Sequence, residues 1–287
     1  MSTLEQIAPY TETETRILEI GGVPIALRMQ NPAFARAVEE RYSGFVSSLD
    51  AGADGSAIVL DVDLIEDAPR EFSDSDPEPE HDDDLEVTCE SGVWLMRRGD
   101  FSALWDSKSG RGWIRQAANP YSLDSVLRIV HSLVLAGRGE FLVHAASAIR
   151  NGRAFLFAGV SGAGKTTISR LAPPDATLLT DEISYVRKSG GGYCAHGTPF
   201  AGELARVGEN CSAPLQALYL LSQGPENRID EVHPTAAAQA LLRHILFFAR
   251  DEQLVQSVFE GACEFVDRAP VRRLTFRPDA SVWDLIG

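Results

Sequence analysis

An eight-residue stretch near the middle of the chain restricts the fold more than any other feature. Residues 159–166 read GVSGAGKT and fit the pattern G-x-x-x-x-G-K-[ST], which is typical of a phosphate-binding loop. Its three glycines let the backbone wrap tightly, so that N–H groups can point at phosphate oxygens. We therefore expect a nucleotide to bind here. The predicted nucleotide-binding residues are Gly159, Val160, Ser161, Gly162, Ala163, Gly164, Lys165, Thr166 and Thr167.

The flanks of this stretch support the motif over a chance match in a glycine-rich turn. Residues 154–158 (AFLFA) predict a buried strand, and residues 167–171 predict a short helix that Pro173 and Pro174 stop. Strand, loop and helix are the context that the motif requires. In that context Lys165 reaches the β- and γ-phosphates of ATP, and the Thr166 hydroxyl binds Mg²⁺.

The strand that enters the loop is expected to pair with the strand before it. Residues 141–149 and 154–158 are apolar runs separated by Asn151-Gly152, which is the strongest short signal of a β-hairpin. The pairing is therefore antiparallel, whereas many phosphate loops follow a strand of a parallel βαβ unit.

Acidic residues follow the next predicted strand. Asp181 and Glu182 come directly after residues 176–180, and ATP-dependent phosphoryl transfer needs a carboxylate for Mg²⁺ and one for the acceptor proton. Glu203, beyond a glycine-rich stretch, is a candidate second metal carboxylate. For Asp181 and Glu182, the alternative is an ordinary acidic corner at the protein surface, between a strand and a turn. His144 lies within an apolar strand, where the residue pattern alone favours a satisfied core histidine.

The charge of the chain is concentrated in one segment. The 287 residues carry a net charge of −15, and residues 66–86 hold eleven acids against the single base Arg70. Such a segment buries little apolar area, so it predicts a disordered loop, with a docking tail for a basic partner as the alternative. The acidity argues against a nucleic-acid partner, because phosphate backbones attract clustered Lys and Arg.

The pattern of strands and helices predicts two parts and an α/β fold with a mixed sheet. Residues 1–119 suggest a small, mostly β N-terminal α+β unit, which includes a helix over 32–46. Residues 120–287 suggest the phosphate-loop domain, which begins with a helix over 121–136. We also expect an irregular stretch over 193–200 and a helix over 234–249.

Cysteine spacing and hydropathy bear on location. Cys89, Cys194, Cys211 and Cys263 form no C-x-x-C pair, which indicates reduced thiols and no zinc site. The first residues lack an apolar signal core, and no apolar run approaches the ~18 residues of a membrane helix. A cytoplasmic protein without a membrane partner is therefore expected.

Several of these segments together carry a family resemblance. The histidine strand, the Asn-Gly hairpin, GVSGAGKTT, LLTDEISYV and HGTPFAGE resemble the HPr kinase/phosphorylase catalytic domain over residues 140–205. The likeness is nearer to divergent HPr-kinase-related proteins seen beside bacterial peptide-modification genes. The resemblance implies a phosphoenolpyruvate carboxykinase-like fold and ATP- and Mg²⁺-dependent phosphorylation of a serine hydroxyl.

The resemblance also implies roles for single residues. His144 corresponds to an active-site histidine beside the phosphates, and Glu203 to a metal-site glutamate. Asp181 and Glu182 correspond to an acidic pair in which one member is the base and the other lies near the metal. The main family has Asp-Asp at this pair, and the stretch LARVGENCSAP after Glu203 departs from its substrate-proximal segment. These departures argue against HPr itself as the substrate.

The sequence thus predicts a kinase that transfers the γ-phosphoryl group of ATP to a hydroxyl, in particular a serine of a protein or peptide. Asp181, Glu182, His144 and Lys165 are the predicted catalytic residues, and Thr166, Asp181 and Glu203 the predicted Mg²⁺ ligands. A small-molecule kinase of the same fold and a non-catalytic nucleotide-binding scaffold are the alternatives. The oligomeric state stays open, with a homo-oligomer among the options.

Overall fold

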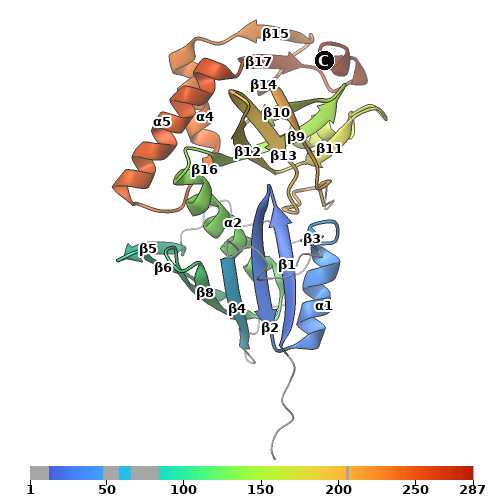
Figure 1. Ribbon diagram of the computed structural model, residues 1–287. Helices are drawn as coiled ribbons and strands as arrows, with labels where there is room; N and C mark the ends of the chain where they lie inside the picture. The colour runs from blue at the N-terminus through green and yellow to red at the C-terminus, as the bar shows by residue number, and fades with distance from the viewer. Residues whose placement is uncertain (1–12, 48–57, 66–83, 205–206, 287) are drawn as a thin grey trace, which may run out of the picture.

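The structure, a computed structural model, describes residues 13–47, 58–65, 84–204 and 207–286. Within these ranges the chain forms two mixed β-sheets with helices packed against them (Figure 1). The fold is therefore α/β with mixed sheets, in agreement with the prediction. The division at residues 119 and 120 stays a prediction, and the position of the helix that follows it is described below.

The first sheet holds the N-terminal strands in the order β3-β1-β2-β4-β8-β7-β6-β5. The pairs β2–β4 and β4–β8 are parallel, and the other neighbours are antiparallel. Its strands are β1 (Glu14–Ile20), β2 (Val23–Met29), β3 (Val46–Ser47), β4 (Ile58–Ile65), β5 (Glu86–Glu90), β6 (Val93–Arg98), β7 (Phe101–Asp106) and β8 (Arg111–Ala117).

The predicted acidic loop lies mostly outside the described residues, which resume at residue 84. Its last residue, Glu86, begins strand β5, so the predicted loop extends too far at this end. Val87 is the one buried residue of β5, and it packs into the core of the first sheet. Burial of that side chain explains why the chain becomes a strand at this point.

Helix α1 (Pro32–Arg41) is shorter than the helix predicted over 32–46. It begins as expected, because the Asn31 side chain accepts hydrogen bonds from the N–H groups of Ala33 and Phe34. It ends at Tyr42, and Gly44 then takes a φ of 87°, which is outside the helical region. The chain is thereby turned into β3, which pairs with β1.

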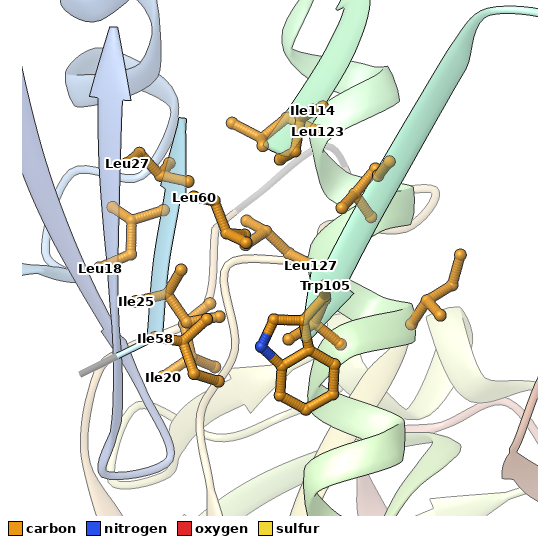
Figure 2. Packing of buried hydrophobic residues seen from close by; sticks show 14 of the residues in the cluster. Leu18, Ile20, Ile25, Leu27, Ile58, Leu60, Trp105, Ile114, Leu123 and Leu127 are labelled. Carbon is orange, nitrogen blue, oxygen red and sulfur yellow. The ribbon is translucent and has the colours of Figure 1, made fainter. Parts of the chain in front are cut away.

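Helix α2 (Pro120–Ala136) covers one face of the first sheet. Figure 2 shows Leu123 and Leu127 directed toward strand residues that include Leu60 and Trp105. Full burial of each such leucine stabilises the fold by roughly 1.5–3 kcal/mol. Although α2 follows the predicted boundary, it therefore shares its core with the N-terminal strands.

The second sheet contains the remaining strands and closes back on itself. Strand β10 pairs antiparallel with β9 and parallel with β14, and β9 continues through β12 and β13 to β14. Its strands are β9 (Phe141–Arg150), β10 (Arg153–Ala158), β11 (Thr177–Thr180), β12 (Ile183–Ser189), β13 (Gly192–His196), β14 (Ser212–Gln223), β15 (Arg228–Glu231), β16 (Ile245–Leu246) and β17 (Val271–Phe276).

The predicted hairpin before the phosphate loop is confirmed. Asn151 and Gly152 have φ angles of 52° and 71°, and Arg150 pairs with Arg153 across the turn. Positive φ at both central residues is the type I′ geometry that matches the twist of an antiparallel pair. The strand before the loop is therefore paired with its predecessor.

Alternate residues of β9 face two different layers of helix. Val143 and Ala145 join the core beneath α4 (Pro234–His244) and α5 (Glu252–Arg268). Ala146 and Ala148 join the core beneath α3 (Lys165–Arg170) and the 3₁₀ helix η1 (Ala280–Asp284). The period of two along a strand puts successive side chains on opposite faces, so both layers lie against one sheet.

Two further predictions need correction in this part of the chain. The helix predicted over 234–249 ends at His244, because Ile245 and Leu246 pair with Val143 and Leu142 of β9. The stretch predicted to be irregular contains β13, whose residues pair with β12 and β14. In both cases hydrogen bonding to a distant strand overrides the local pattern.

The two sheets meet at the turn between β1 and β2. Arg187 of β12 donates a 2.8 Å hydrogen bond to the carbonyl oxygen of Gly21, and a Cβ atom on Gly21 would lie 2.4 Å from the Tyr185 ring. Asn210 donates a hydrogen bond to the carbonyl oxygen of Gly44. The N-terminal part therefore contacts the second sheet through backbone as well as through α2.

Candidate functional site

The phosphate-loop stretch connects β10 to α3, as the motif requires. Gly162 and Gly164 have φ angles of 76° and 110°, where a side chain would be strained. A Cβ on Gly159 would lie 2.6 Å from the Cβ of Ala163, and one on Gly164 would lie 2.6 Å from the Phe276 ring. The loop thus needs glycine for backbone geometry at two positions and for space at two.

Lys165 folds back over the loop. Its Nζ donates a 3.2 Å hydrogen bond to the carbonyl oxygen of Gly159, and the residue is only 8 % exposed. Val160, by contrast, is 74 % exposed at the tip of the loop, and Ser161 is exposed beside it. Thr167 is half-buried in the first turn of α3. The ammonium group therefore already lies against the backbone of the loop.

The predicted metal ligands Thr166 and Glu203 lie together. The Thr166 hydroxyl donates a 2.8 Å hydrogen bond to Oε2 of Glu203, 37 positions further along the chain. A hydroxyl beside an exposed carboxylate supplies the hard oxygen atoms that Mg²⁺ prefers. No group of three or more His, Cys, Asp or Glu side chains suited to a metal occurs among the described residues. The Thr166–Glu203 pair thus brings two oxygen-bearing side chains together, and its role as a metal site stays a prediction.

Asp181 is placed differently from its neighbour. It is 2 % exposed, and its two carboxylate oxygens accept hydrogen bonds of 2.9 Å from the N–H groups of Gly202 and Leu204. These two amides flank Glu203 in the chain. Asp181 therefore fixes the turn that carries Glu203, and both of its oxygens are already engaged.

Glu182 pairs with His144. Nε2 of His144 lies 2.6 Å from Oε1 of Glu182, and the two residues lie where β12 runs antiparallel to β9. The side chain of His144 is 42 % exposed, so the interpretation of His144 as a satisfied core histidine is wrong. Burial on its own would raise the pKa of Glu182. The hydrogen bond and charge of His144, with the charges of Lys165 and Arg128, lower that pKa below its ordinary value.

Three residues that the sequence analysis missed border this site. Gln223, at the end of β14, donates a 2.6 Å hydrogen bond to the carbonyl oxygen of Gly162. His244 ends α4 just before β16, whose first residue, Ile245, pairs with Val143 next to His144. Burial and then the charges of His144, Lys165 and Arg243 lower its pKa to about 4, which leaves it neutral at pH 7. Arg128 is the third.

Arg128 extends from α2, and its guanidinium carbon is 5.2 Å from the centre of the Phe200 ring. These residues carried no local motif, because only the pairing of distant elements brings them to the loop.

The residues that the sequence predicted thus form two adjoining groups. Thr166 and Glu203 lie at the start of α3, and His144 and Glu182 lie within the influence of Lys165.

A pocket of about 760 Å³ adjoins the C-terminal end of α3. Ser169 and Arg170 of α3, Leu204, and residues 209–211 contribute to its walls. Leu204 follows Glu203 directly, so the pocket begins where the Glu203 turn ends. None of the helices in the described part of the chain is both long and apolar enough to cross a membrane.

The described residues thus form an α/β protein with mixed sheets, built around a strand, a glycine-rich loop and a helix. The chain belongs to the family described as SynChlorMet cassette protein ScmC, whose family model matches residues 116–287, more than half of its length. The match begins just before α2.

Among solved structures, the chain is similar to the Hpr(Ser) kinase/phosphatase from Coxiella burnetii. The identity is 10 %, the TM-score is 0.26, and the alignment covers 47 % of this chain and 84 % of that one. No curated protein matches the chain.

Proposed function

We propose that this protein is an ATP- and Mg²⁺-dependent kinase with a phosphoenolpyruvate carboxykinase-like phosphate-loop domain, which phosphorylates a serine hydroxyl of a protein or peptide. The observation that carries the proposal is the position of the His144–Glu182 pair within electrostatic reach of Lys165. A carboxylate beside the lysine of a phosphate loop is what a kinase needs and what a passive nucleotide binder does without.

The loop residues would bind the phosphates of ATP. Backbone N–H groups of residues 159–166 and the Lys165 ammonium would neutralise charge that develops on the transferred group. Lys165 would exchange its bond to the Gly159 carbonyl for one to a phosphate oxygen. Thr166 and Glu203 would hold Mg²⁺, and Asp181 would keep the Glu203 turn in place. When bound, the ion would offset negative charge on the β- and γ-phosphates.

Glu182 is the better candidate for the general base. Its pKa is lowered, so it is ionised at neutral pH, and Asp181 has both oxygens occupied by backbone N–H groups. The acceptor O–H would give its proton to Glu182 while its oxygen bonds to the γ-phosphorus. The bond from that phosphorus to the bridging oxygen would break, and ADP would leave with the electron pair. His144 would orient the Glu182 carboxylate.

The pocket beside α3 favours an extended peptide as the phosphate acceptor. The pocket beside α3 has the exposed residues Arg170, Asn210 and Cys211 in its walls, and it begins next to Glu203. An extended peptide can lie along such a surface with one hydroxyl directed at the site. A small-molecule acceptor is the main alternative, and it predicts that peptide serine stays unlabelled.

The test is transfer of label from γ-labelled ATP with Mg²⁺, with and without a pool of serine-containing peptides. We expect label on peptide serine in the wild-type protein, loss of transfer in Lys165→Ala, and nucleotide binding without turnover in Glu182→Gln. Full turnover by both variants would exclude the proposed site. Tight ATP binding by the wild type with no label on peptide serine would overturn the peptide-kinase proposal in favour of a small-molecule kinase or a nucleotide-binding scaffold.

A further inference from the structure

One face of α2 links the N-terminal strands to the candidate site. Asp124 and Arg128 are four residues apart, so their side chains lie on the same face, one turn from each other. Asp124 is bound by Arg41 through an ion pair and by the Tyr42 hydroxyl, which both come from the end of α1. The charge of Arg128 acts on Tyr42 and also on Glu182. Arg128 thus follows, one turn later on the same helix face, a residue that is bound to the end of α1.

The contact of Arg128 with Phe200 reaches the turn that carries Glu203. The guanidinium lies over the Phe200 ring, and Phe200 is fully buried. Two residues later, a Cβ atom on Gly202 would lie 2.7 Å from Oε2 of Glu182, so the turn touches the carboxylate of the candidate base. A planar guanidinium stacked on an aromatic ring holds that ring through both dispersion and charge, which lysine does less well.

We infer that Arg128 is a positioning residue of this site, which holds the Phe200–Glu203 segment and the Glu182 carboxylate in their working arrangement. The inference rests on the proposed function, and it adds that the helix packed against the N-terminal sheet completes the kinase site. Arg128 influences the reaction through Phe200 and the Glu182 carboxylate.

The test compares Arg128→Met, which keeps the apolar stem, with Arg128→Lys, which keeps the charge. Arg138→Met is the matched control, because Arg138 is exposed just beyond the end of the same helix. Three measurements are made on the full chain. They are phosphate release from Mg²⁺-ATP, the Kd of a fluorescent ATP analogue, and amide hydrogen exchange at Gly202 and Leu204.

We expect the kcat of phosphate release to fall about tenfold in Arg128→Met, with the Kd of the analogue within about threefold of wild type, since the interaction acts on the base and not on the phosphates. Exchange at Gly202 and Leu204 should accelerate about fivefold, the factor that corresponds to loss of one cation–π contact. Arg128→Lys should recover part of both losses, and Arg138→Met should change neither.

A kcat within twofold of wild type in Arg128→Met would overturn the inference, whatever the exchange rates. If Arg128→Met does not fold, Arg128→Lys and Phe200→Leu carry the comparison, and wild-type kcat in both would overturn it. If the wild-type protein does not turn over ATP, the proposed function fails separately, and amide exchange alone tests the inference. Unchanged exchange in Arg128→Met would then also overturn the positioning role, whereas faster exchange would support it.

Discussion

The Thr166 hydroxyl donates a 2.8 Å hydrogen bond to Oε2 of Glu203, which joins the first turn of α3 to the turn that follows Phe200. This contact connects the glycine-rich loop at the start of α3 to a segment that β11, β12 and β13 separate from it in the chain. The Asp181 carboxylate also fixes this turn, because it accepts hydrogen bonds from the N–H groups of Gly202 and Leu204. The arrangement places a carboxylate from a distant part of the chain at the start of α3.

Neutralising Glu203 should weaken the response to Mg²⁺. Glu203→Gln keeps the hydrogen bond to Thr166 but removes the charge, so the Mg²⁺ concentration for half-maximal phosphate release should rise about tenfold. Glu226→Gln is the matched control, because Glu226 is exposed and outside the site. A magnesium titration checks this. The same midpoint in both variants would contradict a metal role for Glu203.

The contact of Gly21 with Tyr185 should stabilise the whole chain. In Gly21→Ala the new Cβ would lie 2.4 Å from the Tyr185 ring at a φ of 59°. Left-handed backbone costs about 1–2 kcal/mol for a non-glycine residue, and overpacking adds about 1–3 kcal/mol. In Gly44→Ala the φ is 87° but no atom lies within 4 Å, so only the backbone cost applies.

Urea unfolding of both variants measures the difference between them. We expect Gly21→Ala to lose the larger amount, because it also disturbs the contact between the two sheets. Equal losses would show that the β1–β2 turn contributes little to their association.

The sequence predicted those features that depend on neighbours in the chain. The turn at Asn151-Gly152 and the loop between β10 and α3 follow from positive φ angles that few residues tolerate. Helix α4 was predicted too long, since apolar periodicity continues past His244 while Ile245 and Leu246 pair with β9. The pairing depends on a strand a hundred residues away, which no local pattern reveals.

The residues of the candidate site likewise divide into those that a local motif predicts and those that only the packing of distant elements brings in. Lys165 and Thr166 belong to a motif with fixed spacing, whereas Arg128 and His244 reach the site through the packing of α2 and the register of β16. Asp181 and Glu182 are adjacent in sequence, yet one is buried against backbone amides and the other pairs with His144. Their different surroundings follow from the turn at Gly202 and from the pairing of β12 with β9, which the sequence does not display.

Acid should destabilise the protein partly through His131. His131 belongs to α2, and its ring is fully buried, with Nδ1 3.3 Å from the Tyr185 hydroxyl oxygen. Burial lowers the pKa of His131 from 6.5 to about 3. The unfolded chain then binds a proton that the folded chain does not. Stability is therefore full above pH 6.5 and falls as the pH drops toward 3, by up to about 1.4 kcal/mol per pH unit from this group.

His131→Gln should reduce that slope, because glutamine keeps polar atoms for Tyr185 and does not titrate. His233→Asn is the control, since His233 is exposed and asparagine also caps α4. Urea unfolding at pH 7.0 and 4.5 measures the slopes. Equal slopes in His131→Gln and the wild type would show that other groups control the acid response.

Gly202 should be needed for the arrangement of the candidate base and not for the fold. A Cβ there would lie 2.7 Å from Oε2 and 2.9 Å from Cβ of Glu182, so Gly202→Ala must displace Glu182, the turn or both. Because Gly202 donates its N–H to Asp181, movement of the turn also weakens the support of Glu203. We expect phosphate release to fall at least about tenfold, with a loss of stability of about 1–3 kcal/mol from overpacking.

Gly99→Ala is the control, because Gly99 lies in the turn between β6 and β7, where a Cβ atom would have no neighbour within 4 Å. It should keep wild-type turnover and stability. Phosphate release measured beside urea unfolding separates a local effect from a global one. Wild-type turnover in Gly202→Ala would mean that the position of Glu182 against this turn has no part in the reaction, and the base would then have to be sought elsewhere in the site.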